Sequence, residues 1–453
     1  HVAVLEQHPG ITININGRAS GSPDDGLRLL RESPLHHAIG NGMDAWKMPQ
    51  GTLNTALQLQ IPLSKAPLPQ TENVQLALNN AQLDMQDLRL PFHQVNSTLS
   101  YDSDNGLQAP TITATLFDKP VSASIDSKKS AQGTSIHVTA NSSANISDIA
   151  TWSQISLLNM LSGATDYSVH LQLEPTNTST PNRIGQLQVS STLDAVDAPL
   201  PAPFTKKRGT KTPFKLNVDL LRNNQQAYRF NYNQQIFGTL TARNGALRNG
   251  DIQLLGSAPK TADQALSNNI NNSLWIHGNL PAADIQQWID MIVQYNKLPP
   301  VRSSNTQQTL YPLVEISAQR ANWKDFSFST LTLNANHAND AWNLSFNTQE
   351  AQGKILFYDA EKTPDVIVDT LSIHRNNTNN TNNVAPQKDN TPLDFSAVPA
   401  LNIRIHHLLV NDMDIGQFST ALRSTLNTLR FENLMGTGKG YFLRDGSGLN
   451  GST

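Results

Sequence analysis

Residues 214–232 read FKLNVDLLRNNQQAYRFNY, and this stretch decides the fold. Its apolar side chains occupy every second position in two runs: Phe214, Leu216, Val218 and Leu220, then Tyr228, Phe230 and Tyr232. Successive side chains of a β-strand point to opposite faces. The stretch therefore predicts two strands, each with one apolar face and one polar face.

The same alternation recurs along the whole chain. Further apolar runs are Ile11/Ile13/Ile15, Leu57/Leu59/Ile61, Val74/Leu76/Leu78, Ile112/Ala114/Leu116, Val121/Ala123/Ile125, Ile136/Val138/Ala140, Val169/Leu171/Leu173, Leu187/Val189, Ile252/Leu254, Leu344/Phe346, Ile403/Ile405 and Leu429/Phe431. Turns such as Asp104-Asn105-Gly106 and Asn244-Gly245 supply the left-handed conformations that tight hairpins need. We therefore predict a mainly antiparallel, meandering sheet. Alternation alone does not distinguish two packed sheets from one curled sheet.

Helical periodicity is confined to three places, each directly after an alternating run. A helix over about 22–40 begins at the capping sequence Ser22-Pro23-Asp24-Asp25. A second helix covers 148–161, and a third opens at Pro281 and carries Trp288 on an apolar face. The second and third share the pattern Asp-Ile-x-x-Trp, which indicates a degenerate repeat of strands plus one helix.

This repeat predicts the organisation of the chain. The expected parts are a β-segment over 1–150 that opens with the first helix, a second β-segment over 151–290, a helix and linker over 281–300, and a C-terminal β-segment over 301–453. The Asn-rich loop 375–392 is expected to be disordered. Residues 199–212, with Lys206-Lys207-Arg208, are expected to form a solvated, Pro-rich excursion.

Composition excludes several classes of protein. The chain has no cysteine, so disulfide frameworks, thiolate zinc sites and cysteine nucleophiles are excluded. Its net charge of -3 provides no positive field for nucleic acid. No apolar run reaches the length of a spanning helix, and no signal peptide precedes the first strand. Because the chain opens at His1 in strand pattern, we expect an internal fragment of a longer protein.

Motifs that carry catalysis are missing from the sequence. The glycines around Gly436-Thr-Gly438-Lys439-Gly440 lack the spacing of a phosphate loop. Asp102-Ser-Asp104-Asn105-Gly106 fits a hairpin turn better than a calcium loop. His36-His37 and His406-His407 are the close histidine pairs. Adjacent residues on a strand point to opposite faces, so His406 and His407 are not expected to share a metal. We therefore expect no enzyme activity, no metal and no cofactor.

Segments spread along the chain resemble the YhdP-type members of the AsmA-like family. They include Leu57-Gln-Leu59-Gln-Ile61-Pro62-Leu63, Leu116-Phe117-Asp118-Lys119-Pro120-Val121, Leu161-Ser162-Gly163-Ala164-Thr165-Asp166-Tyr167, Leu200-Pro201-Ala202-Pro203-Phe204 and His277-Gly278-Asn279-Leu280-Pro281. The resemblance covers nearly all of residues 1–445. Each motif is degenerate, but the motifs follow one another in the same order as in the family. It implies a mainly β fold, a long antiparallel meandering sheet curled into an open gutter (a β-taco or groove), with a few short helices at the repeat joins.

The resemblance also implies a function. Such proteins are similar to bridge-like lipid transporters that contribute to outer-membrane biogenesis in Gram-negative bacteria. They are anchored in the inner membrane by an N-terminal helix and carry phospholipid across the periplasm. The present chain would lack both the anchor and the part that meets an outer-membrane-side partner. Its localisation is therefore expected to be periplasmic, and nucleic acid is not an expected partner.

In such a conduit, the apolar members of the alternating runs would line a groove for acyl chains. The expected lining residues are Ile13, Ile15, Leu57, Leu59, Ile61, Leu76, Leu78, Val95, Leu99, Ile112, Leu116, Val121, Ile125, Ile136, Val138, Val169, Leu171, Leu173, Leu187, Val189, Phe214, Leu216, Val218, Phe230, Leu240, Ile252, Leu254, Ile276, Ile316, Leu331, Leu333, Leu344, Phe346, Ile403, Ile405, Leu429 and Phe431. The competing hypothesis is a structural or adhesive module of stacked sandwiches with no lipid role. A carbohydrate-active β-solenoid ranks last, because no regular coil repeat and no carboxylate cluster is present.

Overall fold

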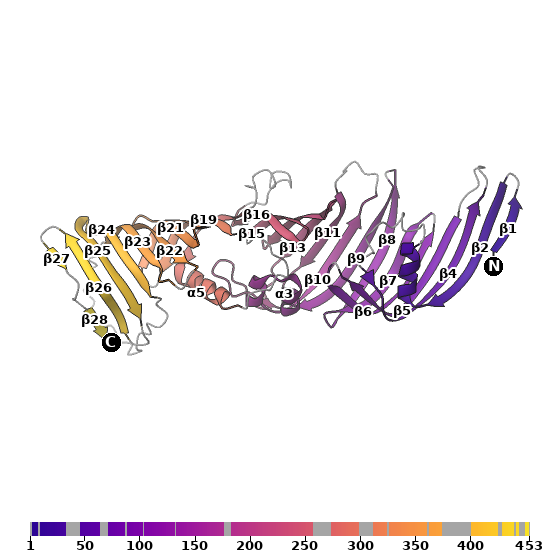
Figure 1. Cartoon of the computed structure of the whole chain (residues 1–453), viewed down its shortest axis with the longest axis horizontal. Coiled ribbons are helices and arrows are strands. Elements are labelled where there is room, and N and C mark those ends of the chain that lie inside the picture. Colours follow the sequence, from indigo (N-terminus) through magenta and orange to yellow (C-terminus); the bar gives the residue numbers. More distant parts are fainter. Residues whose placement is uncertain are drawn as a thin grey trace. The chain divides into compact units, whose positions relative to one another are not determined.

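The fold was analysed in a computed structural model of the chain (Figure 1). It describes residues 2–7, 10–32, 46–63, 71–175 apart from 87, 103 and 132, 183–256, 273–298, 311–373 apart from 324–325 and 360–361, 400–438 apart from 425–427, 441–443 and 449–452. The described chain is mainly β, and its long mixed sheet is not closed into a barrel. The open, mainly β fold expected from the sequence is therefore confirmed.

The chain divides into two compact units. The first comprises His1–Asn233, Gly238–Leu247 and Met291–Gln307, and the second comprises Gln234–Phe237, Arg248–Asp290 and Gln308–Thr453. The predicted segments 1–150, 151–290, 281–300 and 301–453 stay a prediction.

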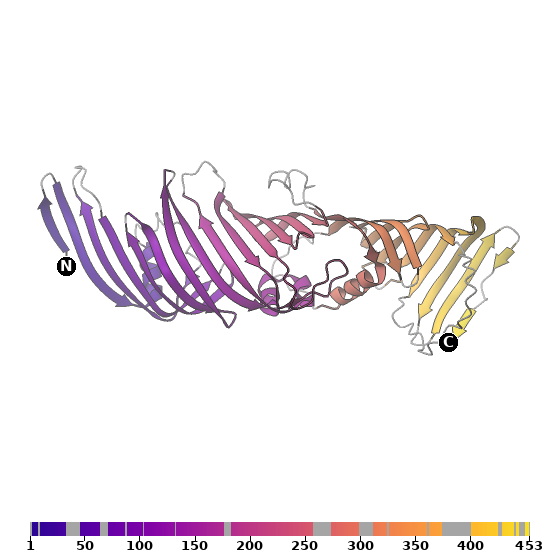
Figure 2. The ribbon, with the colours of Figure 1, turned by 180° about the vertical axis from the view of Figure 1, so that it is seen from behind.

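Strands of the first unit form an antiparallel meander, seen from behind in Figure 2. They are β1 (Val2–Gln7), β2 (Gly10–Gly21), β3 (Trp46–Lys47), β4 (Thr52–Pro62), β5 (Thr71–Met85), β6 (Leu90–Asp102), β7 (Gly106–Leu116), β8 (Lys119–Ser130), β9 (Gly133–Asn145), β10 (Ser162–Leu173), β11 (Arg183–Ser191), β12 (Val196–Asp197), β13 (Phe214–Leu221), β14 (Gln225–Tyr232) and β15 (Ile236–Arg243). The β6–β7 hairpin confirms the turn prediction: the Asp102 carboxylate accepts backbone hydrogen bonds from Asp104 (2.9 Å) and Asn105 (2.6 Å). Hydrogen bonds from Asn105 lower the pKa of the Asp102 carboxyl.

In the second unit, parallel pairs interrupt the meander. Its strands are most of β16 (Ala246–Leu254), then β17 (Leu274–Leu280), β18 (Ala283–Asp284), β19 (Pro312–Trp323), β20 (Phe326–Ala338), β21 (Ala341–Asn347), β22 (Ala351–Tyr358), β23 (Asp365–Ile373), β24 (Leu401–Val410), β25 (Met413–Ser424), β26 (Thr428–Gly438), β27 (Tyr441–Leu443) and β28 (Leu449–Ser452). β16 pairs with β17, β17 and β18 with β19, and β23 with β24 in parallel. The sheet is thus mainly antiparallel, as the sequence predicts, and becomes mixed at these joins, where long connections make the crossovers that parallel pairing requires.

Among the residues that the structure describes, the helical elements are α1 (Pro23–Glu32), α3 (Ile146–Ser153), the 3₁₀ turn η2 (Ser156–Met160) and α5 (Ile285–Asn296). At α1 the Ser22 hydroxyl caps the helix by accepting a hydrogen bond from the Asp25 backbone N–H (3.1 Å), and it donates one to the Asp25 carboxylate (2.7 Å). The predicted helix over 148–161 is broken at Gln154, which takes the left-handed conformation. No helix in the described part of the chain is long and apolar enough to span a membrane.

Some predictions fall on residues that the structure does not describe. The end of the first predicted helix, beyond residue 32, and His36-His37 lie outside the described residues, as does the Asn-rich loop 375–392.

Candidate functional site

Six neighbouring strands of the first unit, β8, β9, β10, β11, β13 and β14, place apolar side chains in register. Direct partners in neighbouring strands point to the same face. The first row is Ala123, Ala140, Val169, Val189, Leu216 and Phe230, and the second is Ile125, Val138, Leu171, Leu187, Val218 and Tyr228. A third row consists of Ser127, Ile136, Leu173, Gly185, Leu220 and Gln226. We call these three lines of residues the apolar rows.

The apolar rows are only partly covered. In the first two rows Val218, which is 5% exposed, is the one fully buried member, and the others are half-buried. Inner residues of a β-sandwich pack against a second sheet and lose nearly all of their exposure. Among the described residues the rows therefore lack the burial of a sandwich core, and their side chains present hydrocarbon to whatever enters the face.

The second unit repeats this arrangement. One row is Ile252, Ile276, Val314, Ala335, Leu344, Ile355, Val366 and Ile403. The other is Leu254, Gly278, Ile316, Leu333, Phe346, Gly353, Val368, Ile405 and Phe418. The expected lining residues did not include Val314, Ala335, Ile355, Val366, Val368 and Phe418, although the alternation of Val366 and Val368 was a usable signal.

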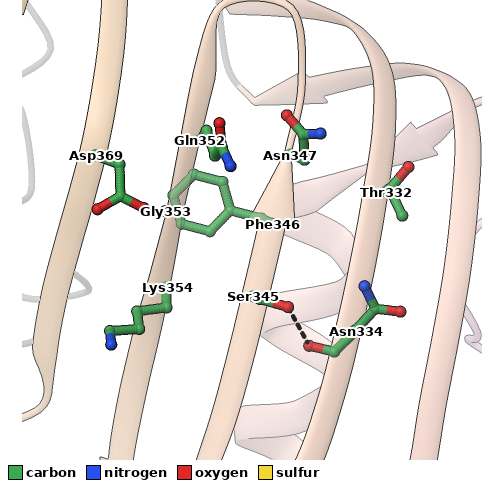
Figure 3. A pocket seen from close by; sticks show the side chains of 9 residues that line it. All are labelled: Thr332, Asn334, Ser345, Phe346, Asn347, Gln352, Gly353, Lys354 and Asp369. Atoms are coloured by element: carbon green, nitrogen blue, oxygen red, sulfur yellow. Dashed lines mark hydrogen bonds between the residues drawn. The ribbon is translucent and has the colours of Figure 1, made fainter.

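Glycines in these rows make room for aromatic rings. A Cβ at Gly353 would lie 3.0 Å from the Phe346 Cζ, and Figure 3 shows that ring directed toward Gly353. A Cβ at Gly436 would likewise lie 2.9 Å from the Phe418 Cε1. A ring can thus lie flat across a neighbouring strand without a break in the apolar surface.

Most of the other expected lining residues lie directly opposite an apolar residue of a neighbouring strand. In the first unit the pairs are Ile13 with Ile61, Ile15 with Leu59, Leu76 with Leu99, Leu57 with Val74 and Leu78 with Leu53. In the second unit Leu331 lies opposite Ala318 and Phe431 opposite Leu422, whereas Leu429 lies opposite Ser424. Ile112 extends the first row through Ala123, and Phe214 pairs with Tyr232. Leu240 lies two residues after Gly238, whose Cβ would meet the Phe230 ring, so Leu240 shares that face.

Val95, Leu116 and Val121 lie in a packed core under α1 instead of on an open face. They cluster with Leu27 of α1 and with Met48, and all five are at most 9% exposed. The first helix therefore covers the apolar face of its neighbouring strands.

A second cover is formed by residues 192–213, which we call the cover segment. Its strand β12 pairs with the start of β10, and Val196, Ala198 and Phe204 are at most 2% exposed. The Tyr232 hydroxyl donates a hydrogen bond to the Phe204 carbonyl (3.3 Å), and burial raises the pKa of this phenol. The cover segment thus closes the end of the apolar rows where β10 and β13 begin.

Lys206 holds the cover segment together, which corrects the prediction of a solvated basic excursion. Its side chain is 5% exposed, and the ammonium donates to the carbonyls of Val196 (2.7 Å), Asp194 (3.3 Å) and Lys207 (3.3 Å). Three carbonyl dipoles offset much of the cost of burying the charge. A basic triplet in sequence did not reveal this burial, because the acceptors come from the fold.

The remaining helices differ in how they pack. The Trp152 indole of α3 donates a hydrogen bond to the Leu88 carbonyl (2.8 Å), which fixes α3 to the β5–β6 connection. In α5, Ile289 and Ile292 are 41% and 51% exposed, so part of the apolar face predicted around Trp288 faces solvent.

No group of side chains with metal-binding composition occurs in the described part of the chain. His406 pairs with Asp369 (3.3 Å) and His407 with Asp414 (3.0 Å), so the two histidines contact separate carboxylates. A pocket of about 250 Å³ lies against β20–β23 (Figure 3). Its lining combines polar side chains such as Asn334, Gln352 and Lys354 with Phe346 and Gly353 of the second-unit row.

Comparison with known proteins gives one match. A family model described as YhdP protein matches residues 2–446. No curated protein and no solved structure matches the chain.

Proposed function

The chain belongs to the YhdP family, and from this premise we propose that its apolar rows are a path for phospholipid acyl chains. The family is a non-enzymatic transport family with a role in lipid transport. Membership implies a periplasmic, bridge-like protein. In our proposal the path runs between the inner and outer membranes of a Gram-negative bacterium. The proposal includes attachment to the inner membrane and a partner on the outer-membrane side.

The observation that carries the proposal is the register of the first two apolar rows across β8, β9, β10, β11, β13 and β14. Apart from Val218 their members are half-buried, so the surface is available to hydrocarbon. Two acyl chains contain about 30 methylene groups, and exposing them to water costs about 24 kcal/mol at about 0.8 kcal/mol each. A continuous apolar surface removes most of this barrier, while the polar outer face keeps the protein in water.

This mechanism requires a continuous apolar surface more than it requires particular side chains. Conservative apolar substitutions keep the surface intact, whereas a charge on the apolar rows interrupts it. Transport along such a surface is passive, so the driving force and the direction come from the membranes or from partners.

The test is to measure phospholipid bound to the purified chain by mass spectrometry. We expect phospholipid to co-purify with the unaltered chain and to be lost in Leu171→Asp, because Leu171 lies in the second apolar row between Val138 and Leu187. Gln172→Asp is the matched control, since it adds the same charge on the opposite face and should leave lipid content unchanged. Lipid-free protein, or equal lipid in both variants, would instead favour an all-β structural module.

A further inference from the structure

The apolar face of the second unit becomes aromatic where β20 ends and β21 begins. His337 follows Ala335 at the next same-face position of β20. Trp342 precedes Leu344 in the same way in β21. His337 and Trp342 are direct partners, and Trp342 is also the direct partner of Phe357 in β22. Rings therefore continue the row that contains Ala335 and Leu344.

Four side chains gather around His337 at this end, and we call Tyr311, His337, Trp342 and Asp359 the aromatic cluster. The Tyr311 ring stacks on the imidazole, with centroids 3.7 Å apart and 12° between the planes. The Trp342 indole makes T-shaped contacts with Tyr311 (6.0 Å) and His337 (5.6 Å). The His337 Nε2 lies 3.0 and 2.9 Å from the two carboxylate oxygens of Asp359. These contacts place Tyr311 and Asp359, which lie outside the strands, beside the rings.

The aromatic cluster has a buried centre and exposed sides. The His337 side chain is 8% exposed, whereas that of Asp359 is 44% exposed and Tyr311 is 42% exposed. A neutral imidazole that donates from Nε2 orients the carboxylate without cancelling its charge. Because a carboxylate has about four lone-pair sites, Asp359 can accept from a further donor that arrives from water.

A neighbouring cation is directed to the other side of the sheet. The Lys362 ammonium lies 3.7 Å from the centroid of the Tyr358 ring and 3.9 Å from the Asp365 carboxylate. Tyr358 follows Phe357 in β22, so its side chain points to the opposite face. The aromatic cluster thus presents a carboxylate beside its rings, which favours a cation over a phosphate.

An ammonium group can use the carboxylate and a ring at the same time. It donates to an oxygen at about 3 Å, and it is attracted to the face of a Tyr or Trp ring within about 6 Å of the centroid. Asp359 and Tyr311 contact the same imidazole, so one ammonium can reach both. Tyr and Trp are also the side chains that gather at the headgroup level of membranes.

We infer that the aromatic cluster binds the ammonium of an aminophospholipid, such as phosphatidylethanolamine, whose tails lie on the two rows of the second unit. The inference rests on the proposed function, extends it to the second unit and adds the class of headgroup. A headgroup without a cation, such as that of phosphatidylglycerol, would bring its phosphate toward the Asp359 carboxylate with no compensating charge.

The experiment captures lipid beside the aromatic cluster in the whole chain. A photoreactive phenylalanine analogue takes the place of Phe357, the direct partner of Trp342. In a second chain it takes the place of Leu356, which points to the opposite face. Each chain is exposed to vesicles with equal amounts of phosphatidylethanolamine and phosphatidylglycerol, and mass spectrometry identifies the attached lipid.

Two substitutions are then compared in the chain with the analogue at position 357. Asp359→Asn removes the charge of the aromatic cluster with little change in shape. Asp414→Asn is the matched control, because the Asp414 side chain is 47% exposed and also pairs with a histidine, His407, at 3.0 Å.

We expect position 357 to capture phosphatidylethanolamine about fivefold more often than phosphatidylglycerol, as one exposed ion pair and one cation–π contact imply. The preference should disappear in Asp359→Asn and persist in Asp414→Asn, and position 356 should capture neither lipid. Equal capture of the two lipids at position 357, or the same preference in both variants, would overturn the inference and leave the proposed function intact. A chain that binds no phospholipid at all would instead overturn the proposed function.

Tyr311→Leu tests the ring without altering the carboxylate, and it decides the question if Asp359→Asn proves unstable. The pair of His337 with Asp359 remains, so the preference for phosphatidylethanolamine should fall about twofold, through loss of the cation–π contact alone. Full preference in Tyr311→Leu would contradict the inference.

Discussion

Lys206 illustrates how a single side chain can fix the cover over an otherwise open face. Its charge is buried among three backbone carbonyls, and Ala198 and Lys206 exchange two backbone hydrogen bonds of 2.9 Å. Burial lowers the pKa of the ammonium below 10.5, and the nearby carboxylates of Asp194 and Asp197 oppose the shift.

The lowered pKa predicts how stability depends on pH. Between the lowered pKa and 10.5 the unfolded chain binds more protons at Lys206 than the folded chain, so the contribution of Lys206 to the free energy of unfolding rises with pH in that window. Lys206→Met should be less stable at neutral pH by about 1–3 kcal/mol, because the carbonyls of Val196, Asp194 and Lys207 lose the ammonium as a donor. The Asp194 and Lys207 carbonyls keep the backbone donors Gly209 (2.8 Å) and Thr210 (3.2 Å). The difference from the unaltered chain should widen as the pH rises toward 10.5.

Chemical denaturation at neutral and alkaline pH measures both effects. Lys207→Met is the control, because Lys207 is exposed and adjacent. A difference between the unaltered chain and Lys206→Met that stays constant with pH would contradict this account of Lys206.

At the scale of elements, α1 acts as a cover whose stability depends on one leucine. Leu27 is 6% exposed and packs with Met48, Val95, Leu116 and Val121. Leu27→Ala should lower the free energy of unfolding of the first unit by about 2–3 kcal/mol, through lost burial and a cavity. Hydrogen exchange of the α1 backbone and chemical denaturation would measure the change.

The matched control for this cover is the next residue. Arg28 is exposed, its side chain pairs with Asp25 at 2.9 Å, and Arg28→Ala should change stability by less than about 0.5 kcal/mol. Similar effects of the two substitutions would mean that α1 does not pack on the sheet in solution.

The elements could be predicted from sequence wherever the signal is local. Alternation in β13 and β14 and the cap at Ser22 each determine a strand or a helix start within a few residues. The break at Gln154 and the parallel pairing of β23 with β24 depend on where distant strands lie. The burial of Lys206 depends on carbonyls in the folded cover segment, so neither composition nor periodicity predicts it.

At the scale of the molecule, the apolar rows of the first unit and the two corresponding rows of the second unit each run across several neighbouring strands. Sequence alternation predicts which side chains share a face, but not whether a second layer covers that face. The half-burial of Leu171 and Leu216, and the packed core beneath α1, required the fold. Predicted lining residues such as Leu171 and Leu216 therefore remain candidates for lipid contact until contact is measured.

Site-specific photo-crosslinking measures that contact most directly. A photoreactive amino acid at Leu216, in the first apolar row, would be compared with one at Asn217, the next residue and on the opposite face. After exposure of the whole chain to phospholipid vesicles, mass spectrometry should find an acyl chain attached at position 216 and none at position 217. Capture at neither position, or equally at both, would contradict the claim that the apolar rows hold lipid.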